Sequence, residues 1–278
     1  MSQAWDQGLQ PQPVHMTLAG WLRAGLRAVP LALVTFGCLA VLLLIRLFER
    51  PLCGVHRPVT PFITQFVCWS AFRIMGIKHR VTGEVMKKHG AVVANHGSWL
   101  DIFALNVSKR IYFVSKSEVA DWPGIGLLAR ATGTVFINRD RREAQAQKQM
   151  FQDRLKAGHK LLFFPEGTST DGQRVLPFKS TLFAAFLTDE LKDILWIQPV
   201  SVLYTAPNGE DVRFYGWWGD MGFGSHLKKI LAARRQGRVD VVYHPPVRIA
   251  DFSCRKSLAK HLERVIRDAV LPQLTAGS

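Results

Sequence analysis

Two short apolar runs, each ending abruptly at polar and glycine residues, constrain the fold of this chain most strongly. The first run covers residues 91–94 and stops at Asn-His-Gly-Ser-Trp-Leu-Asp, residues 95–101. The second covers residues 161–164 and stops at Pro-Glu-Gly-Thr, residues 165–168. Runs of this length that end in polar loops are typical of buried strands. We therefore expect both loops to border a single cleft.

Apolar strand candidates alternate with helical stretches from about residue 77 onward. Candidate strands cover residues 91–94, 111–115, 134–137, 160–164, 196–204 and 240–243, and helix-compatible patterns cover residues 142–157 and 180–188. This alternation predicts an α/β fold, with a mainly parallel mixed sheet flanked by helices. Functional sites in such sheets lie at the carboxyl ends of strands, where both polar loops fall.

The amino-terminal region predicts a membrane anchor. Residues 29–45 contain no charged side chain over 17 positions, which is the lower limit for a membrane-spanning helix. Residues 62–74 are also apolar but too short to span, and suit a helix lying in the membrane interface. We expect residues 1–76 to form membrane-anchoring helices and residues 77–278 the α/β domain. Whether the first helix crosses the bilayer or enters one leaflet is left open by the sequence.

The distribution of basic residues predicts the orientation in the membrane. Arg23 and Arg27 precede the uncharged run, Arg46, Arg50 and Arg57 follow it, and no Lys or Arg occurs before residue 23. The excess of positive charge after the run favours an inner-membrane protein whose carboxyl-terminal domain faces the cytoplasm.

The overall charge predicts anionic partners. The chain has a formal net charge of +15 and an isoelectric point near 10.1. An anionic membrane surface or an acidic carrier protein fits this charge, whereas the sequence carries no recognisable nucleic-acid-binding module. The four cysteines form no C-x-x-C pair, so neither a disulfide framework nor a metal site is expected.

His96 and Asp101 are the candidate catalytic pair. Histidine is well suited to accept a proton near neutral pH, and a carboxylate on its other ring nitrogen fixes the tautomer. A structural interpretation is also open, because Ser98 and Asp101 match a capping box with Ser98 as the N-cap of the following helix. Both roles can coexist in one carboxylate.

Four sequence blocks in order resemble the glycerolipid acyltransferase family, which includes 1-acylglycerol-3-phosphate acyltransferases. They are Asn-His-x4-Asp at residues 95–101, Gly-Thr-Val-Phe-Ile-Asn-Arg at 133–139, Phe-Pro-Glu-Gly-Thr at 164–168 and Ile-Gln-Pro-Val-Ser-Val at 197–202. The resemblance extends over roughly residues 62–250. It implies a helical membrane motif ahead of a catalytic domain that transfers acyl groups.

This resemblance implies a lysolipid O-acyltransferase that uses an acyl carrier protein or CoA thioester as donor. His96 is then the base that takes the proton of the lysolipid hydroxyl, with Asp101 orienting it, and no metal or organic cofactor is required. Glu166, Gly167 and Thr168 are expected to help bind the acceptor. Arg139 suits an anionic headgroup, although a solvated surface position explains it equally well.

The tetrahedral intermediate also needs fixed hydrogen-bond donors. Backbone amides near Gly97 or Gly167 are the candidates, because both residues lie where a strand gives way to a loop.

The acceptor is the least determined part of the prediction. Many phosphatidate-forming members have an arginine after Glu-Gly-Thr, whereas this chain has Ser169. Residues 117–123, the tail at 169–172 and residues 219–227 resemble the bacterial branch that includes lyso-ornithine lipid acyltransferases. We therefore place lyso-ornithine lipid slightly ahead of 1-acylglycerol-3-phosphate, and both can serve one enzyme.

Three alternatives remain open from the sequence. The first is a strict 1-acylglycerol-3-phosphate acyltransferase of phospholipid biosynthesis. The second is a lysophospholipid remodelling or hydrolase-like enzyme that uses acyl-CoA. The third is a non-catalytic protein that keeps the fold and binds membranes or nucleic acid.

Overall fold

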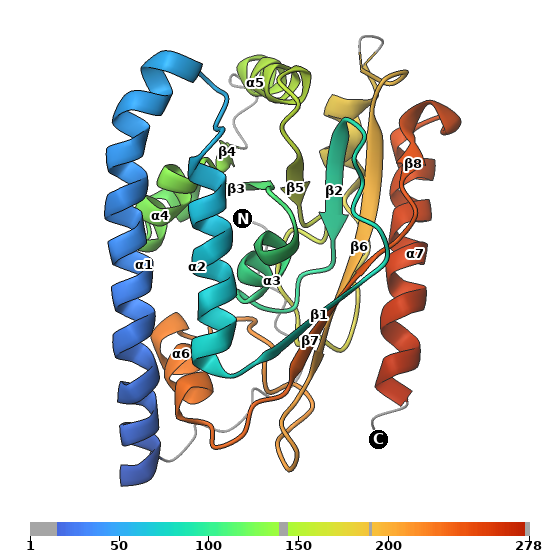
Figure 1. Ribbon diagram of the computed structural model, residues 1–278. Helices are drawn as coiled ribbons and strands as arrows, with labels where there is room; N and C mark the ends of the chain where they lie inside the picture. The colour runs from blue at the N-terminus through green and yellow to red at the C-terminus, as the bar shows by residue number, and fades with distance from the viewer. Residues whose placement is uncertain (1–15, 139–143, 189–190, 276–278) are drawn as a thin grey trace.

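The computed structural model describes residues 16–138, 144–188 and 191–275 of the 278-residue chain. Eight strands in this part of the chain form one sheet, in the order β1-β7-β6-β2-β5-β3-β4, with β8 pairing with β6 (Figure 1). The strands are β1 Lys78–Thr82, β2 Gly90–Ala94, β3 Tyr112–Lys116, β4 Val135–Ile137, β5 Leu161–Phe163, β6 Trp196–Thr205, β7 Arg238–Tyr243 and β8 Val247–Arg248. Strand β6 runs antiparallel to β7 and β8, and the other neighbouring pairs are parallel. The predicted mainly parallel mixed sheet is confirmed.

Helices cover both faces of the sheet. The α-helices are α1 Leu18–Cys53, α2 Thr60–Met75, α3 Asp101–Ser108, α4 Ile125–Thr132, α5 Ala144–Lys156, α6 Phe223–Ala232 and α7 Arg255–Thr275, and the 3-10 segments are η1 Ser117–Asp121, η2 Ser180–Phe186 and η3 Ile249–Asp251. Figure 1 shows α1, α2 and α6 on one side and α7 on the other.

The alternation of side chains along β2 creates two separate cores. Val92 and Ala94 pack with α2, α3 and α6 on one face, whereas Ala91 and Val93 pack with α5, η2 and α7 on the other. All five residues of β2 are buried. A central strand that is apolar on both faces is the expected pattern for a parallel sheet covered on both sides.

Helix α1 is longer than the uncharged run that predicts it. It contains 36 residues, or about 54 Å at 1.5 Å per residue, and it is long and apolar enough to cross a membrane by length and composition. Both of its ends are tied to the rest of the protein. Arg23 and Arg27 donate hydrogen bonds of 2.7–2.8 Å to the carbonyl groups at the end of α6, and the carboxylate of Glu49 accepts from the backbone amides of Val59 and Thr60 at the start of α2.

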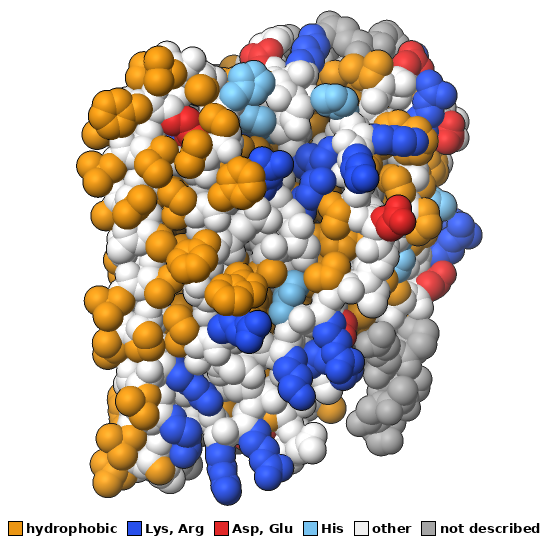
Figure 2. All heavy atoms as spheres, in the orientation of Figure 1, with side chains coloured by type: hydrophobic (Ala, Val, Ile, Leu, Met, Phe, Trp, Pro, Cys, Tyr) orange, Lys and Arg blue, Asp and Glu red, His pale blue; other side chains and the backbone are white. Residues whose placement is uncertain are grey.

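The outer surface of α1 and α2 is strongly apolar. We call this surface the apolar face. It includes Leu22, Leu26, Leu33, Phe36, Leu44, Phe48, Leu52, Phe62, Phe66 and Trp69, all more than 40% exposed. Figure 2 shows hydrophobic side chains gathered over these helices, with Lys and Arg side chains beside them. An apolar surface of this extent on the described part of the chain indicates contact with lipid or another apolar partner.

Several sequence expectations need correction. The stretch at residues 180–188 forms the 3-10 segment η2 rather than an α-helix. The sequence patterns do not predict strands β1 and β8 or helices α6 and α7. The helix expected at residues 142–157 is confirmed in its described part as α5.

Candidate active site

The two polar loops meet at one edge of the sheet. Strands β2 and β5 are parallel neighbours, with Val93 opposite Phe163, so their carboxyl ends lie together. The His96 ring stacks on Phe164 with ring centroids 4.0 Å apart and planes within 11°. The predicted convergence of both loops on one site is confirmed.

His96 and Asp101 form a hydrogen-bonded pair. His96 Nδ1 lies 2.8 Å from Asp101 Oδ2. The Asp101 side chain is fully buried, while that of His96 is 18% exposed. Because an ionised carboxylate only accepts hydrogen bonds, Nδ1 carries the proton and Nε2 is the nitrogen that can take a proton from a substrate.

The loop after His96 and strand β6 also fix the position of Asp101. Its Oδ2 atom also accepts the backbone N–H groups of Gly97 and Ser98, at 2.9 and 3.0 Å. Its Oδ1 atom accepts the hydroxyl of Tyr204 at 2.7 Å, from the end of β6. Burial, together with the nearby Asp101 carboxylate, raises the pKa of Tyr204 well above its ordinary value. Four donors therefore hold this carboxylate in one orientation.

Asn95 and Trp99 anchor the loop on either side of His96. The Asn95 side chain exchanges two hydrogen bonds with the backbone of Val202 on β6, at 2.8 and 2.9 Å. The Trp99 indole donates to Nδ1 of the buried His226 on α6 at 2.9 Å. Burial lowers the pKa of His226 to about 3, so this histidine is a neutral acceptor.

The capping-box interpretation is confirmed for Asp101 and wrong for Ser98. Helix α3 begins at Asp101 with Leu100 as its N-cap, so Ser98 is not the N-cap residue. The carboxylate of Asp101 does accept the Ser98 amide, as the acidic residue of a capping box would. The same oxygen also binds His96 Nδ1, so one carboxylate orders the loop and orients the histidine.

Glu166 joins the histidine loop to the second polar loop. Its Oε1 atom accepts the His96 backbone N–H, and its Oε2 atom accepts the Leu176 N–H, both at 2.7 Å. Glu166 is only 2% exposed, and burial raises its pKa to about 8 against the effect of these two donors. Both oxygens thus contact backbone amides, an arrangement that positions His96.

Gly167 and Gly97 have steric reasons to be glycine. Gly167 has φ +73°, and a Cβ atom there would lie 2.5 Å from Lys179 Nζ. At Gly97 a Cβ atom would lie 3.0 Å from Gly172 Cα. The Gly97 N–H donates to Asp101 and the Gly167 N–H donates to the Phe164 carbonyl at 3.0 Å. These two amides are therefore engaged within the protein rather than directed at an oxyanion.

The residues after Gly167 lead back to the loop that carries His96. Thr168 follows Gly167, with its hydroxyl 3.5 Å from the Ser169 carbonyl. The Thr170 N–H donates to the His96 carbonyl at 2.9 Å, which places Ser169 beside the loop that carries His96. Arg139 lies outside the described residues.

The described residues contain no group of three or more His, Cys, Asp or Glu arranged to hold a metal ion.

Tyr204 is the site residue that sequence reasoning missed. It ends the apolar run of β6, so the pattern identifies it only as a strand residue. The available signal is a polar hydroxyl at the carboxyl end of a strand that neighbours β2.

Comparison with known proteins identifies the family of this chain. Residues 78–202 match the family model described as Acyltransferase. A lyso-ornithine lipid O-acyltransferase from Rhodobacter capsulatus is 58% identical over 264 residues, which covers 95% of this chain and 96% of that protein. The chain belongs to the acyltransferase family.

Two further relatives share less sequence identity with this chain. A 1-acyl-sn-glycerol-3-phosphate acyltransferase from Neisseria meningitidis is 32% identical, covering 64% of this chain and 68% of that protein. The crystal structure of the 1-acyl-sn-glycerophosphate acyltransferase from Thermotoga maritima has the same fold, with a TM-score of 0.58 and 22% identity over 90% of this chain and 98% of that one. This acyltransferase therefore combines the family fold with a hydrogen-bonded histidine–aspartate pair whose aspartate is buried.

Proposed function

We propose that this acyltransferase transfers a fatty acyl group from a thioester to the hydroxyl group of lyso-ornithine lipid. The observation that carries the chemistry is the 2.8 Å contact between His96 Nδ1 and the fully buried Asp101. The relative with 58% identity, named for lyso-ornithine lipid, supports the choice of acceptor.

The proposed reaction is direct transfer without an acyl-enzyme. His96 Nε2 takes the proton of the lysolipid hydroxyl while its oxygen attacks the thioester carbonyl carbon. The tetrahedral intermediate then collapses, the carbon–sulfur bond breaks, and the departing thiolate receives the proton held by His96. The Asp101 carboxylate stabilises the imidazolium between these two proton transfers. His96 and Asp101 are thus the proposed catalytic residue and its orienting partner.

Tyr204 is a proposed positioning residue of this pair, and its hydroxyl is a testable part of the mechanism. Tyr204→Phe removes one of the four hydrogen-bond donors to Asp101. Because this hydrogen bond is made to a charged group, we expect its loss to lower kcat about tenfold and to leave KM unchanged. Steady-state kinetics of the purified protein measure the effect. Tyr243→Phe, which removes another buried tyrosine hydroxyl on the neighbouring strand β7, is the matched control. A Tyr204→Phe enzyme within twofold of wild type would remove Tyr204 from the mechanism.

The proposed donor is an acyl carrier protein or CoA thioester. Both donors are anionic, and a chain with a net charge of +15 attracts them at long range. Arg139, Glu166, Gly167 and Thr168 remain the proposed acceptor-binding residues. For Glu166 we propose an indirect contribution, because its oxygens hold the backbone of the loops that border the acceptor.

A second candidate acceptor is 1-acylglycerol-3-phosphate, favoured by the Neisseria meningitidis relative named for it. The two acceptors differ in the headgroup, which is a phosphate monoester in one and an ornithine with ammonium and carboxylate in the other. Ser169 lies one residue before Thr170, whose amide binds the His96 carbonyl. Residue 169 is therefore close enough to the catalytic loop to influence headgroup choice.

The acceptor preference can be tested by substitution of Ser169. We expect the wild-type enzyme to use lyso-ornithine lipid at least as efficiently as 1-acylglycerol-3-phosphate. Ser169→Arg adds a guanidinium, so it should raise the relative kcat/KM for the phosphate acceptor by about tenfold, the value of one charge-assisted hydrogen bond. Ser169→Gln is the uncharged control. A wild-type enzyme that acylates only 1-acylglycerol-3-phosphate, with Ser169→Arg inert, would reverse the order of the two acceptors.

We also propose that α1 and α2, within residues 1–76, seat the enzyme on the cytoplasmic side of the inner membrane. Helix α1 packs against α2, α4 and α6 along its length, and both ends are tied to these elements by Arg23, Arg27 and Glu49. If α1 crossed the bilayer, the elements packed along it would have to enter the bilayer too. A helix lying in one leaflet, with the apolar face in lipid and the sheet in the cytoplasm, accommodates all of these contacts.

A further inference from the structure

A large basic cleft opens at the edge of the sheet opposite the active site. Its volume is about 1120 Å³. It is lined by residues that precede or begin β2, β3 and β5 and by residues 52–65 of α1, α2 and their connection, whereas His96 follows the carboxyl end of β2. Five residues of β2 at about 3.3 Å each place roughly 16 Å between the two ends of this strand. We call this space the amino-end cleft, and it is separate from the proposed catalytic site.

The cleft has a high density of positive charge. Its basic lining residues are Arg57, Lys87, Lys109, Arg110 and Lys160, together with three histidines, and none of its lining residues among those described is acidic. Burial lowers the pKa of Lys160 to about 8, with Lys109 adding repulsion. Burial also lowers the pKa of Arg57 to about 10, with Arg46 and Arg154 adding repulsion. Glu49 partly offsets this repulsion at Arg57. The described lining of the cleft itself holds no carboxylate, so its cations favour the binding of an anion.

A buried polar atom in the cleft has no partner. His159 is 6% exposed, and its Nδ1 atom makes no hydrogen bond to the described residues. Its ring is stacked on Tyr112, with centroids 4.4 Å apart, so it is held in place. Buried polar atoms are nearly always hydrogen-bonded in folded proteins. The unsatisfied Nδ1 therefore points to a polar group that enters the cleft and reaches this atom.

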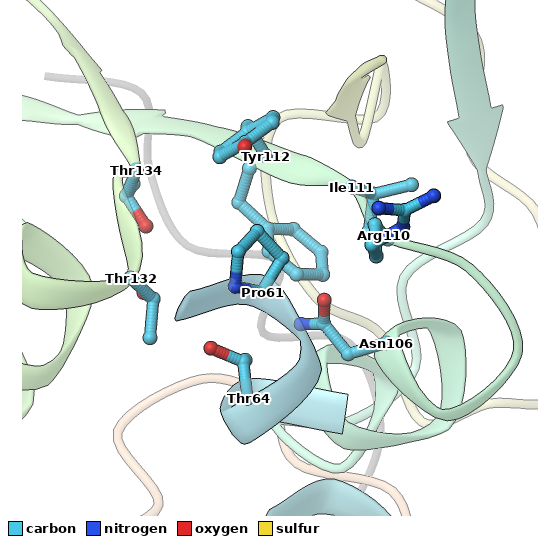
Figure 3. A pocket seen from close by; sticks show the side chains of 9 residues that line it. Pro61, Thr64, Asn106, Arg110, Ile111, Tyr112, Thr132 and Thr134 are labelled. Carbon is cyan, nitrogen blue, oxygen red and sulfur yellow. The ribbon is translucent and has the colours of Figure 1, made fainter. Parts of the chain in front are cut away.

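The cleft is continuous with the apolar face. Leu52 and Phe62 line the cleft and are 82% and 55% exposed. The guanidinium of Arg110 lies 4.7 Å from the centre of the Phe62 ring. Figure 3 shows the smaller neighbouring pocket, in which Pro61, Arg110 and Tyr112, which also line the cleft, come together. In Figure 2 basic and histidine side chains lie directly beside the hydrophobic surface.

We propose that the amino-end cleft binds the phosphate headgroup of one anionic phospholipid of the bilayer. The headgroup contacts the lysines and arginines and reaches His159 Nδ1, while the acyl chains lie along the apolar face at Leu52 and Phe62. A folded acidic protein fits less well, because the unpartnered atom is too deeply buried to be reached by a protein surface. The proposal rests on the membrane seating described above and assigns no part of the cleft to catalysis.

The test measures lipid retention by the full-length protein. Purified protein in non-ionic detergent micelles is mixed with phosphatidylglycerol or phosphatidylcholine, and retained lipid is counted by native mass spectrometry. We expect one phosphatidylglycerol per wild-type protein and little phosphatidylcholine. The double variant Lys109→Gln/Lys160→Gln should lower retention of phosphatidylglycerol about tenfold, because it loses at least one charge-assisted hydrogen bond to the headgroup. Arg110→Gln, at an exposed position, is a second variant with the same expected direction.

The matched control removes two charges elsewhere. Arg255 and Lys256 are exposed on α7, on the face of the sheet away from α1, so Arg255→Gln/Lys256→Gln should retain the lipid like the wild type. Equal retention by the cleft variants and this control would overturn the proposal. Binding of inorganic phosphate by the wild type, lost in the cleft variants, with no retention of phosphatidylglycerol would also overturn it, in favour of a free phosphate site. Cleft variants that lose acyl carrier protein binding but keep the lipid would assign the cleft to the donor instead.

Vesicle flotation separates this proposal from membrane seating. A wild-type protein that floats with phosphatidylglycerol vesicles but retains no lipid in micelles would contradict the headgroup site and leave the seating intact. A protein that retains the lipid without floating would contradict the seating and leave the headgroup site intact.

Discussion

Replacing His96 with alanine is expected to lower kcat for acyl transfer by about 10²–10⁴-fold, the usual contribution of a general base. The reason is geometric. Asp101 occupies Nδ1 at 2.8 Å, and no other described histidine is paired with a buried carboxylate at the carboxyl end of β2. The measurement is turnover of an acyl carrier protein thioester with lyso-ornithine lipid, with thermal unfolding recorded in parallel.

The control for this variant is His261→Ala. His261 lies on α7 against Phe252, on the far side of the sheet, so its loss should leave turnover unchanged. Folding and membrane association of the His96→Ala protein should match the wild type, because its backbone contacts to Glu166 and Thr170 do not use the imidazole. A fall in kcat of less than about tenfold would be too small for a general base.

Replacing Asp101 with asparagine is expected to lower kcat by a similar factor, about 10²–10⁴-fold. The carboxylate accepts from His96, Gly97, Ser98 and Tyr204, and an amide has one accepting oxygen and one donating nitrogen. His96 Nδ1 and the amides of Gly97 and Ser98 share Oδ2. If the amide nitrogen takes this position, the imidazole adopts the tautomer with the proton on Nε2, which cannot act as a base, and the loop N–H groups lose their acceptor. If the amide nitrogen takes the position of Oδ1, the Tyr204 hydroxyl loses its acceptor.

The kinetic and structural effects of Asp101→Asn can be separated. Asp121→Asn, at an exposed position in η1, controls for loss of a carboxylate and should leave both turnover and melting temperature unchanged. We expect Asp101→Asn to lower kcat in addition to the melting temperature. An Asp101→Asn enzyme with reduced stability but normal kcat would show that the carboxylate only orders the start of α3.

Local sequence patterns predicted the centre of the site because its parts are close in the chain. His96 and Asp101 are five residues apart, and the apolar run before them identifies the end of a strand. The second loop at residues 165–168 was placed correctly for the same reason, since parallel neighbouring strands bring their carboxyl ends together.

The supporting contacts were not predictable in the same way because they depend on long-range register. Tyr204 reaches Asp101 from more than 100 residues away, and its position depends on how far β6 extends beyond β2. The two carboxylate oxygens of Glu166 contact loops on both sides, which no local pattern shows. The positions of Gly97 and Gly167 after two strands predict oxyanion-binding backbone amides in these loops. In the folded loops, the amides of these two residues donate to Asp101 and Phe164 instead.

The fold was predicted where strands are buried and missed where they are polar. Strand β1 has the sequence Lys-His-Arg-Val-Thr and an almost fully exposed pattern, so it carries no apolar signal and depends on pairing with β7.

Helix α7 did carry a sequence signal, since Leu258, Leu262, Ile266 and Val270 recur every four residues and are buried. The segment at 180–188 has helical periodicity, but it forms the 3-10 segment η2, which places Phe183 and Phe186 in the core against Phe163.

The central claim is that His96 activates the lysolipid hydroxyl for direct attack on the thioester. It is tested most directly by mixing the purified enzyme with a labelled acyl carrier protein thioester, with and without lyso-ornithine lipid, and recording the masses of both protein and lipid. The account predicts that the acceptor gains one acyl group and becomes ornithine lipid, and that the enzyme mass is unchanged when the acceptor is absent. An acyl adduct on the enzyme, or no ornithine lipid with an active donor, would contradict it.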